Sequence, residues 1–376
     1  MSLKHESISV IAKPTHDCNL RCAYCYIEEN AENGKMDNEL LAQTIERVSN
    51  FAKKSHWIWH GGEPLLMGVD FYRTIKDIQD FYGQRGASFS NGIQTNATLI
   101  NRDLLNFSQE TGDFRIGMSI DGPQNLHDST RVYPDGTGSF DRVMAGIDLV
   151  KQYRGSAGAI CVVSAKNVDS PEELYNFFRD TKIHVKFNPL IKSGRALENM
   201  SELGITPRQY GDFLSKLWQV YENDSLKLGE TPIDVDPFLE IIGNLETERP
   251  LGCNYSATCR DSFISIGPNG DIYPCGRFDG IKQFWMGNVQ THTIEEAVES
   301  EANQSLRGRN LETVSGCKTC DFGKVCNSGC MHNAYCAGDV KGKDPYCASY
   351  LNVFEKMRNV LTIEKQKVER GEKDNE

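Results

Sequence analysis

The chain has 376 residues and a net charge of −11, and 39% of its residues are hydrophobic. This length and apolar content predict a folded protein with a core of its own and more than one structural unit. The acidic balance argues against nucleic acid as a partner, because phosphate binding relies on clustered Lys and Arg.

The start of the chain and its cysteines indicate the compartment. No apolar run approaches the roughly 20 residues that span a bilayer, and the polar N-terminus lacks the features of a signal peptide. We therefore expect a cytoplasmic protein that has no membrane partner. In that reducing compartment, thirteen cysteines predict metal binding or redox chemistry rather than disulfides.

Strand-like and helix-like segments alternate through the first half of the chain. Helical periodicity covers Asn38–Lys53 and Pro171–Thr181. Strands alternating with helices of this length predict right-handed βαβ units and a parallel sheet. We predict an α/β fold, a partial, six-stranded version of the TIM-like (β/α) barrel. The expected strands are Ile8–Ala12, Trp57–His60, Phe89–Thr95, Phe114–Ile120, Ala159–Ala165 and His184–Leu190.

The pattern changes after residue 225. The stretch from Gly252 to Cys347 has few long helical periods and is rich in Cys, Gly, Asn and Asp, which is typical of a metal-organised segment. A final helix is expected from Ser349 to about Thr362, followed by a charged tail. We predict a barrel over 1–225, a bridge over 226–250, a cysteine-rich domain over 251–348, and a C-terminal helix and tail over 349–376.

The first cysteine cluster follows the first strand, at the end where barrel enzymes place their chemistry. Cys18, Cys22 and Cys25 are separated by three and then two residues. Three thiolates on a four-iron cluster leave one iron open for a substrate or cofactor, whereas a structural zinc site is closed by four protein ligands. His16 is the alternative fourth ligand of such a zinc site.

The run CNLRCAYCY resembles the signature of the radical S-adenosylmethionine (SAM) family. The resemblance implies that Cys18, Cys22 and Cys25 bind a [4Fe-4S] cluster. The open iron of that cluster chelates the methionine amino and carboxylate groups of SAM. Tyr24 is then expected to help hold the adenine. Reductive cleavage of the cofactor gives a 5′-deoxyadenosyl radical that abstracts hydrogen from a C–H bond.

Several polar or glycine positions at strand ends support this cofactor. Gly61 and Gly62 let the backbone approach a ligand closely, and Glu63 can receive an ammonium. By resemblance, this GGEP-like segment holds the methionine amino group; by itself a Gly-Gly pair is equally typical of a turn.

Three further cofactor contacts are expected at the barrel mouth. Gln94 ends the third strand, and Ser119, at the end of the fourth, is the preferred ribose contact. Arg131 can pair with the methionine carboxylate. Gln94 and Ser119 can instead be strand-end caps or turn residues, and Asp121-Gly122-Pro123 is equally typical of a turn. Arg131 can instead be a solvated side chain.

Ten cysteines remain, and the spacing of most of them indicates metal binding. A CxxC pair followed by two further cysteines fits zinc as well as iron–sulfur. The whole arrangement resembles the SPASM domain of radical enzymes that modify peptides. This resemblance implies two closed auxiliary [4Fe-4S] clusters, hence three clusters in all. Their ligands would be Cys253, Cys259, Cys275 and Cys330 for the first, and Cys317, Cys320, Cys326 and Cys347 for the second.

Two cysteines are left over. Cys161 lies in an apolar strand and is most simply a small buried hydrophobe. Cys336 comes four residues after His332 and is an alternative ligand, although the spacing to Cys347 suits the SPASM pattern better.

The chain resembles anaerobic sulfatase-maturating enzymes, which oxidise a Cys or Ser to formylglycine. In that family an Asp directly follows the third cysteine of the first auxiliary cluster and serves as base. Here that position is Gly276, and Asp279 can substitute only if the loop turns back. We therefore expect instead a peptide maturase that forms an oxidative crosslink, a cyclophane or thioether, in a ribosomally made precursor.

Two alternatives to crosslinking stay open: formylglycine formation, and a non-catalytic iron–sulfur electron carrier. The expected partners are a peptide or protein substrate and an external one-electron donor of the flavodoxin or ferredoxin type. Because the first strand begins by residue 8, we expect no N-terminal leader-binding domain, which leaves that role to a separate protein.

Overall fold

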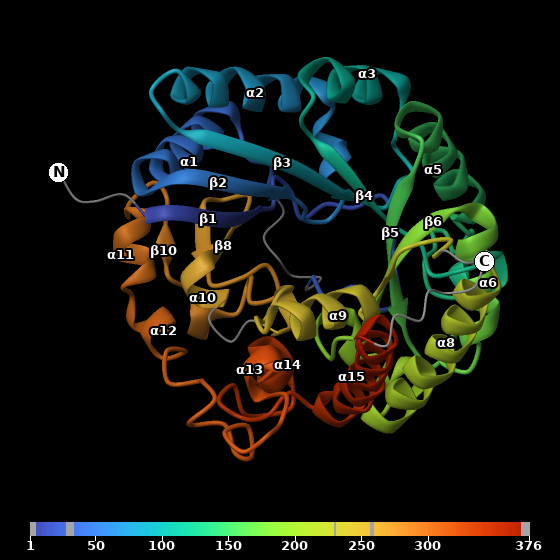
Figure 1. The fold of residues 1–376 in the computed structure, drawn as a ribbon. Coiled ribbons are helices and arrows are strands. Elements are labelled where there is room, and N and C mark those ends of the chain that lie inside the picture. The colour runs from blue at the N-terminus through green and yellow to red at the C-terminus, as the bar shows by residue number, and fades with distance from the viewer. Residues whose placement is uncertain (1–4, 28–33, 229–230, 256–258, 370–376) are drawn as a thin grey trace.

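The computed structural model describes residues 5–27, 34–228, 231–255 and 259–369. Six parallel strands form neighbouring pairs in chain order and curve into an open barrel with helices on its outer side (Figure 1). Each overlaps a predicted strand, so the partial-barrel prediction is confirmed. They are β1 (His5–Ala12), β2 (Ala52–Trp59), β3 (Ser88–Thr95), β4 (Arg115–Ser119), β5 (Ala157–Val163) and β6 (Ile183–Pro189).

The long helices of the barrel bury the apolar stripe that the sequence predicts. In α1 (Asn38–Phe51), Leu41, Ile45 and Val48 are fully buried. Each such side chain stabilises the fold by about 1.5–3 kcal/mol relative to leaving it exposed. Asp37 caps this helix by accepting the backbone N–H of Leu40 at 2.8 Å. The others are α2 (Val69–Gly83), α3 (Arg102–Thr111), α5 (Phe140–Arg154), α6 (Pro171–Thr181) and α8 (Pro207–Leu228).

The cysteine-rich half extends the sheet of the barrel. β8 (Phe263–Ile266) pairs in parallel with β1, and β9 (Asp271–Tyr273) and β10 (Gly287–Asn288) continue in antiparallel fashion. On the opposite edge β7 (Val235–Asp236) pairs with β6. One ten-stranded sheet therefore runs through both predicted domains. Since α8 also crosses residue 225, the proposed domain limits stay a prediction.

The C-terminal helix closes the side of the barrel. α15 (Cys347–Glu369) packs against α8 and α9 (Phe238–Thr247), with Phe354 and Met357 fully buried. It is longer than predicted, and residues 370–376 of the expected tail lie outside the described ranges. The short helices are α4 (Gln124–His127), α7 (Met200–Leu203), α10 (Cys259–Ser262), α11 (Ile294–Val298), α12 (Glu301–Gln304), α13 (Gly323–Cys326) and α14 (Met331–Cys336).

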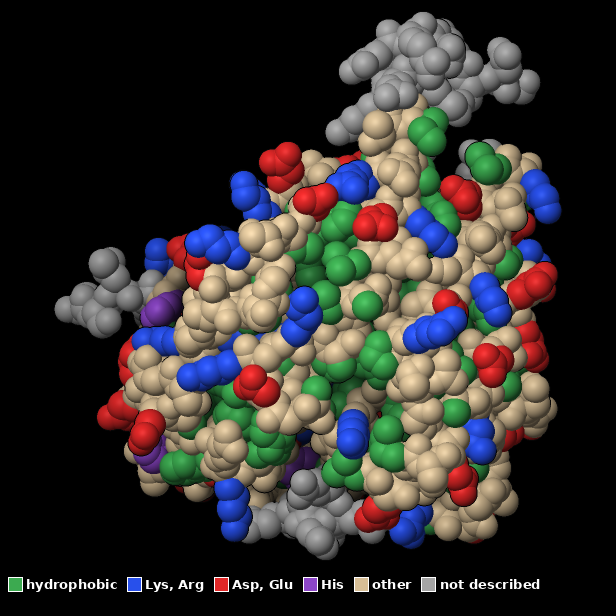
Figure 2. Space-filling model, turned by 90° about the horizontal axis from the view of Figure 1, so that it is seen from below, with side chains coloured by type: hydrophobic (Ala, Val, Ile, Leu, Met, Phe, Trp, Pro, Cys, Tyr) green, Lys and Arg blue, Asp and Glu red, His purple; other side chains and the backbone are tan. Residues whose placement is uncertain are grey.

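The surface seen from below carries scattered charges of both signs, with hydrophobic side chains gathered towards its middle (Figure 2). In the part of the chain that the structure describes, no helix combines the length and apolar character needed to cross a bilayer.

Candidate active site

The loop after β1 brings three thiols together at the barrel mouth. Burial, together with the nearby charges of Cys22 and Cys25, raises the pKa of Cys18 to about 12. Burial also raises the pKa of Cys22, which lies near Cys25. Three adjacent thiols that are partly accessible at the barrel mouth fit a metal cluster, because iron binds thiolates and replaces their protons.

A single metal ion is a poorer match for the described side chains. Among them, no three His, Cys, Asp or Glu groups are close enough together to hold one ion. A four-iron cluster is larger, and its cysteines stand further apart. His16, the alternative zinc ligand, places its Nε2 atom 2.9 Å from Oδ2 of Asp279.

The two glycines after β2 are required by the cysteine loop itself. A Cβ atom on Gly62 would lie 2.1 Å from the carbonyl oxygen of Asp17, and one on Gly61, at φ +123°, would lie 2.3 Å from that of Thr15. The backbone N–H of Gly62 donates to Thr15 O at 3.0 Å, and that of Glu63 donates to Asp17 O at 2.8 Å. The close approach that the sequence predicts is therefore first an approach to protein backbone.

Glu63 is fully buried and ties two strand ends together. Its Oε1 accepts the backbone N–H of Leu65 at 2.9 Å and the hydroxyl of Thr95 at 2.7 Å, and its Oε2 accepts the N–H of Asn96 at 2.8 Å. A carboxylate offers about four acceptor positions. One position on Oε2 is thus left for the ammonium expected from the sequence.

Arg131 belongs to a buried network rather than to solvent. Its Nη1 donates to the Tyr24 hydroxyl at 2.8 Å, and that hydroxyl bonds Asp121 Oδ2. Asp121 Oδ1 also accepts the N–H of Val162 at 3.0 Å, which makes Asp121 a hub rather than a turn residue. The Nε atom of Arg131 is buried and has no hydrogen-bond partner within the described ranges. An anionic ligand such as the SAM carboxylate would satisfy it.

Gln94 and Ser119 meet across neighbouring strands. The Gln94 side-chain amide donates to the Ser119 hydroxyl oxygen at 3.1 Å. This bond fixes the serine oxygen and leaves its O–H free to donate to a ligand such as a ribose hydroxyl.

The eight cysteines of the extension group into two sets. Burial, followed by the charges of Cys275, Cys253 and Cys330, raises the pKa of Cys259. We call these four the first auxiliary set.

The other four form the second auxiliary set. Burial, together with the neighbouring Cys347, Cys317 and Cys320, raises the pKa of Cys326 to about 12. The structure therefore assembles both expected sets, and their role as ligands stays a prediction.

Of the two remaining cysteines, Cys161 lies apart from these sets, whereas Cys336 lies near Cys330 of the first set. Cys161 is fully buried in β5, as a small hydrophobe would be. The sulfur of Cys336 contacts Nδ1 of His332 at 3.6 Å and is the alternative ligand left open by the sequence.

We expect Cys320→Ala to remove the iron of one cluster and to lower solubility, because the second cluster organises the loops around it. Iron per chain, measured after anaerobic reconstitution, tests this. Cys336→Ala is the matched control and should keep full iron. Full iron in Cys320→Ala, or a loss in Cys336→Ala instead, would contradict the ligand assignment.

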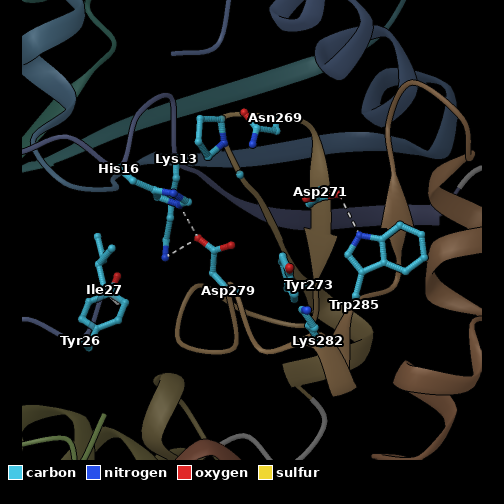
Figure 3. A pocket seen from close by; sticks show the side chains of 13 residues that line it. Lys13, His16, Tyr26, Ile27, Asn269, Asp271, Tyr273, Asp279, Lys282 and Trp285 are labelled. Carbon is cyan, nitrogen blue, oxygen red and sulfur yellow. Dashed lines mark hydrogen bonds and ion pairs between the residues drawn. The ribbon is translucent and has the colours of Figure 1, made fainter. Parts of the chain in front are cut away.

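A pocket of about 580 Å³ opens between the cysteine loop and the β8–β9 hairpin (Figure 3). Asp279 points at Lys13 and His16 on its wall, with Oδ2 2.8 Å from Lys13 Nζ. The backbone N–H of Phe278 donates to Cys275 O at 3.0 Å, so the loop does turn back. Although burial opposes its charge, Lys13 and His16 hold the pKa of Asp279 well below its usual value.

Sequence reasoning missed Lys13, which is 1% exposed at the end of the first barrel strand. Its Nζ also donates to the carbonyl oxygen of Gly276 at 2.8 Å. The available signal was a charged residue directly after a buried strand, since a buried cation requires a partner.

Comparison with known families matches both halves of the chain. Residues 12–178 match the Radical SAM superfamily, and residues 258–321 match the SPASM iron–sulfur cluster-binding domain.

Several similar curated proteins are anaerobic sulfatase-maturating enzymes. The serine-type anaerobic sulfatase-maturating enzyme of Bacteroides thetaiotaomicron is 30% identical, with 96% of this chain and 91% of that protein covered. The cysteine-type enzyme of Clostridium novyi is 28% identical, with 95% and 97% covered.

Solved structures agree on the fold. A histidine-tagged form of anSMEcpe with bound AdoMet superposes with a TM-score of 0.83 at 25% identity, covering 94% of this chain and 95% of that one. Native anSMEcpe with bound AdoMet and Kp18Cys peptide gives a TM-score of 0.81 at 23% identity, covering 94% and 99%.

Proposed function

The chain belongs to the radical SAM superfamily, in the group with a SPASM domain that includes anaerobic sulfatase-maturating enzymes, and we propose that it oxidises a Cys or Ser side chain of a peptide substrate to formylglycine. It binds S-adenosylmethionine and a [4Fe-4S] cluster in the first domain and auxiliary iron–sulfur clusters in the second. The similar curated proteins favour this reaction over the crosslink expected from Gly276.

The reaction removes a hydrogen atom, a proton and an electron from the substrate side chain. When bound, the cluster and S-adenosylmethionine supply the radical that takes the hydrogen atom from Cβ. For a Cys substrate, water then replaces the sulfur. The sulfur leaves as hydrogen sulfide, and the substrate carbon becomes the aldehyde. The chain has to hold the cofactor, exclude other donors of hydrogen and accept the proton. The auxiliary clusters held by the second domain would take up the electron.

Tyr24, Gln94, Ser119 and Arg131 are proposed to hold the cofactor. Gln94 and Ser119 lie at the ends of β3 and β4, and Tyr24 lies in the cysteine loop. The buried Nε of Arg131, in the loop after α4, provides the unsatisfied donor that a carboxylate requires. Glu63 keeps one acceptor position for the ammonium. These groups are fixed by hydrogen bonds before any ligand arrives, which reduces the cost of ordering them.

The position of Asp279 is the observation that carries the proposal. Gly276 leaves the usual base position without a side chain, but the turn after Cys275 aims Asp279 into the pocket beside His16 (Figure 3). A carboxylate that orients a histidine is an established arrangement for accepting a proton. Because Asp279 is strongly ionised, we propose that it works with His16.

A peptide crosslink is the second candidate, and one observation favours it. A side chain at position 276 is opposed by Ile11, whose Cγ2 would lie 2.9 Å from the new Cβ. The packing of Ile11 therefore disfavours the family's aspartate at position 276. Such an enzyme would abstract hydrogen from a side-chain carbon and join that carbon to a second residue.

Incubation with short sulfatase-derived peptides, one with Cys and one with Ser at the target position, tests the proposal. We expect an aldehyde at that residue, seen by mass spectrometry and by hydrazide capture, together with 5′-deoxyadenosine. A crosslinked peptide with loss of two hydrogens and no aldehyde would favour the second candidate. Absence of 5′-deoxyadenosine would leave only the electron-carrier alternative.

Reduction of the clusters needs an external electron. We propose a donor of the flavodoxin or ferredoxin type, because its single electron matches the one that starts each cofactor cleavage. A separate leader-binding protein stays a prediction for the case in which the substrate is a ribosomal precursor with a leader.

A further inference from the structure

Arg277 lies against the first auxiliary set. Its Nη1 is 3.8 Å from the sulfur of Cys330, and its backbone N–H donates to the sulfur of Cys275 at 3.4 Å. One residue therefore makes hydrogen bonds to two of the four thiols in this set. Hydrogen bonds from a cation are stronger than neutral ones, and more so away from water.

The guanidinium is held in this position by a second contact. Nη1 also donates to Oδ1 of Asn333 at 3.3 Å. The Asn333 side-chain amide donates to Oδ2 of the buried Asp344 at 3.1 Å, and the same oxygen accepts the N–H of Cys330 at 2.9 Å. Asp344 thus fixes both the asparagine that positions Arg277 and the cysteine that receives its hydrogen bond.

The two auxiliary sets differ in the cations that face them. An arginine side chain is not deprotonated in proteins, so Arg277 brings a full positive charge to Cys275 and Cys330. Both cysteines belong to the first set. In the second set, Lys343 acts on Cys347, but it is exposed to solvent and therefore screened. The buried Arg309 acts on Cys317 of the second set, but it also acts on Cys330 and Cys259 of the first set, so it does not favour the second set.

We propose that Arg277 raises the reduction potential of the first auxiliary cluster and makes it the easier of the two auxiliary clusters to reduce. Reduction adds one electron and one negative charge to the cluster, with no bond made or broken. A buried cation and a hydrogen bond to a ligand sulfur stabilise the reduced form more than the oxidised one. This role is independent of the product that the enzyme forms.

A redox titration followed by electron paramagnetic resonance tests the proposal. The full chain with Cys18, Cys22 and Cys25 all replaced by Ala leaves only the auxiliary signals. Titrated with dithionite, it should show two separate midpoints. Arg277→Met in this background should move the higher midpoint to more negative potential and leave the lower one in place. Arg277→Lys keeps the charge but loses the planar fork, so its shift should be smaller.

Arg73→Met is the matched control. It removes one positive charge from the exposed face of α2, where Arg73 pairs with Asp70, and should move neither midpoint. Unchanged midpoints in Arg277→Met at full iron content, an equal shift of both, or a shift of the lower one alone would overturn the proposal. If Arg277→Met loses iron, Arg277→Gln and Arg277→Lys replace it in the test. Unchanged midpoints in both of these variants would overturn the proposal.

Discussion

Cys22→Ala is expected to abolish cleavage of S-adenosylmethionine. Cys22 is one of three adjacent thiols, and a four-iron cluster held by two thiolates loses the geometry that presents its open iron. Burial raises the pKa of the Cys22 thiol, so the thiolate that binds iron forms only when the metal displaces the proton. Release of 5′-deoxyadenosine from the reduced, reconstituted protein is the measurement.

Cys161→Ala provides the control for this variant. It removes a buried sulfur from β5 without touching any of the three cysteine sets, and should keep both iron and cofactor cleavage. Retained cleavage in Cys22→Ala would mean that the triplet is not the site of radical formation. Loss in both variants would indicate a general effect on folding.

Asp279→Asn should lower product formation by about a hundredfold or more, the usual contribution of a positioned acid or base. The substitution preserves the shape of the side chain and a carbonyl oxygen that can accept from Lys13, so the pocket should persist. It removes the charge that orients His16 and that stabilises the protonated form of this histidine. Cofactor cleavage should continue, because Asp279 belongs to the pocket and not to the cysteine triplet.

Product and 5′-deoxyadenosine measured together show this uncoupling. Asp224→Asn is the matched control. Like Asp279, Asp224 is a partly buried carboxylate paired with a cation, here Arg179 at 3.3 Å, but it lies on α8 away from the pocket. Product at the unmodified rate in Asp279→Asn would rule out the pair of Asp279 and His16 as the proton acceptor. Equal loss of product and cofactor cleavage would assign it a structural role only.

Local patterns in the sequence were enough to predict the barrel and the first cysteine cluster. The alternation of apolar strands and amphipathic helices depends on neighbouring residues, and β1 through β6 lie where this alternation places them. The spacing of Cys18, Cys22 and Cys25 is likewise a property of one short loop. The two auxiliary sets needed the family resemblance, because their members interleave along the chain.

Tertiary structure alone decided the roles of Gly62, Glu63 and Asp279. Gly62 has to be glycine because a carbonyl oxygen of the cysteine loop leaves no room for a side chain. Most of the hydrogen-bond acceptor positions of Glu63 are taken by residues at the end of β3 and beside it. His16 and Asp279 are 263 positions apart and meet because β8 pairs with β1. Sequence therefore determined which chemistry this protein carries. The proposed proton acceptor depends on pairing between distant strands, because no local pattern encodes a contact of that separation.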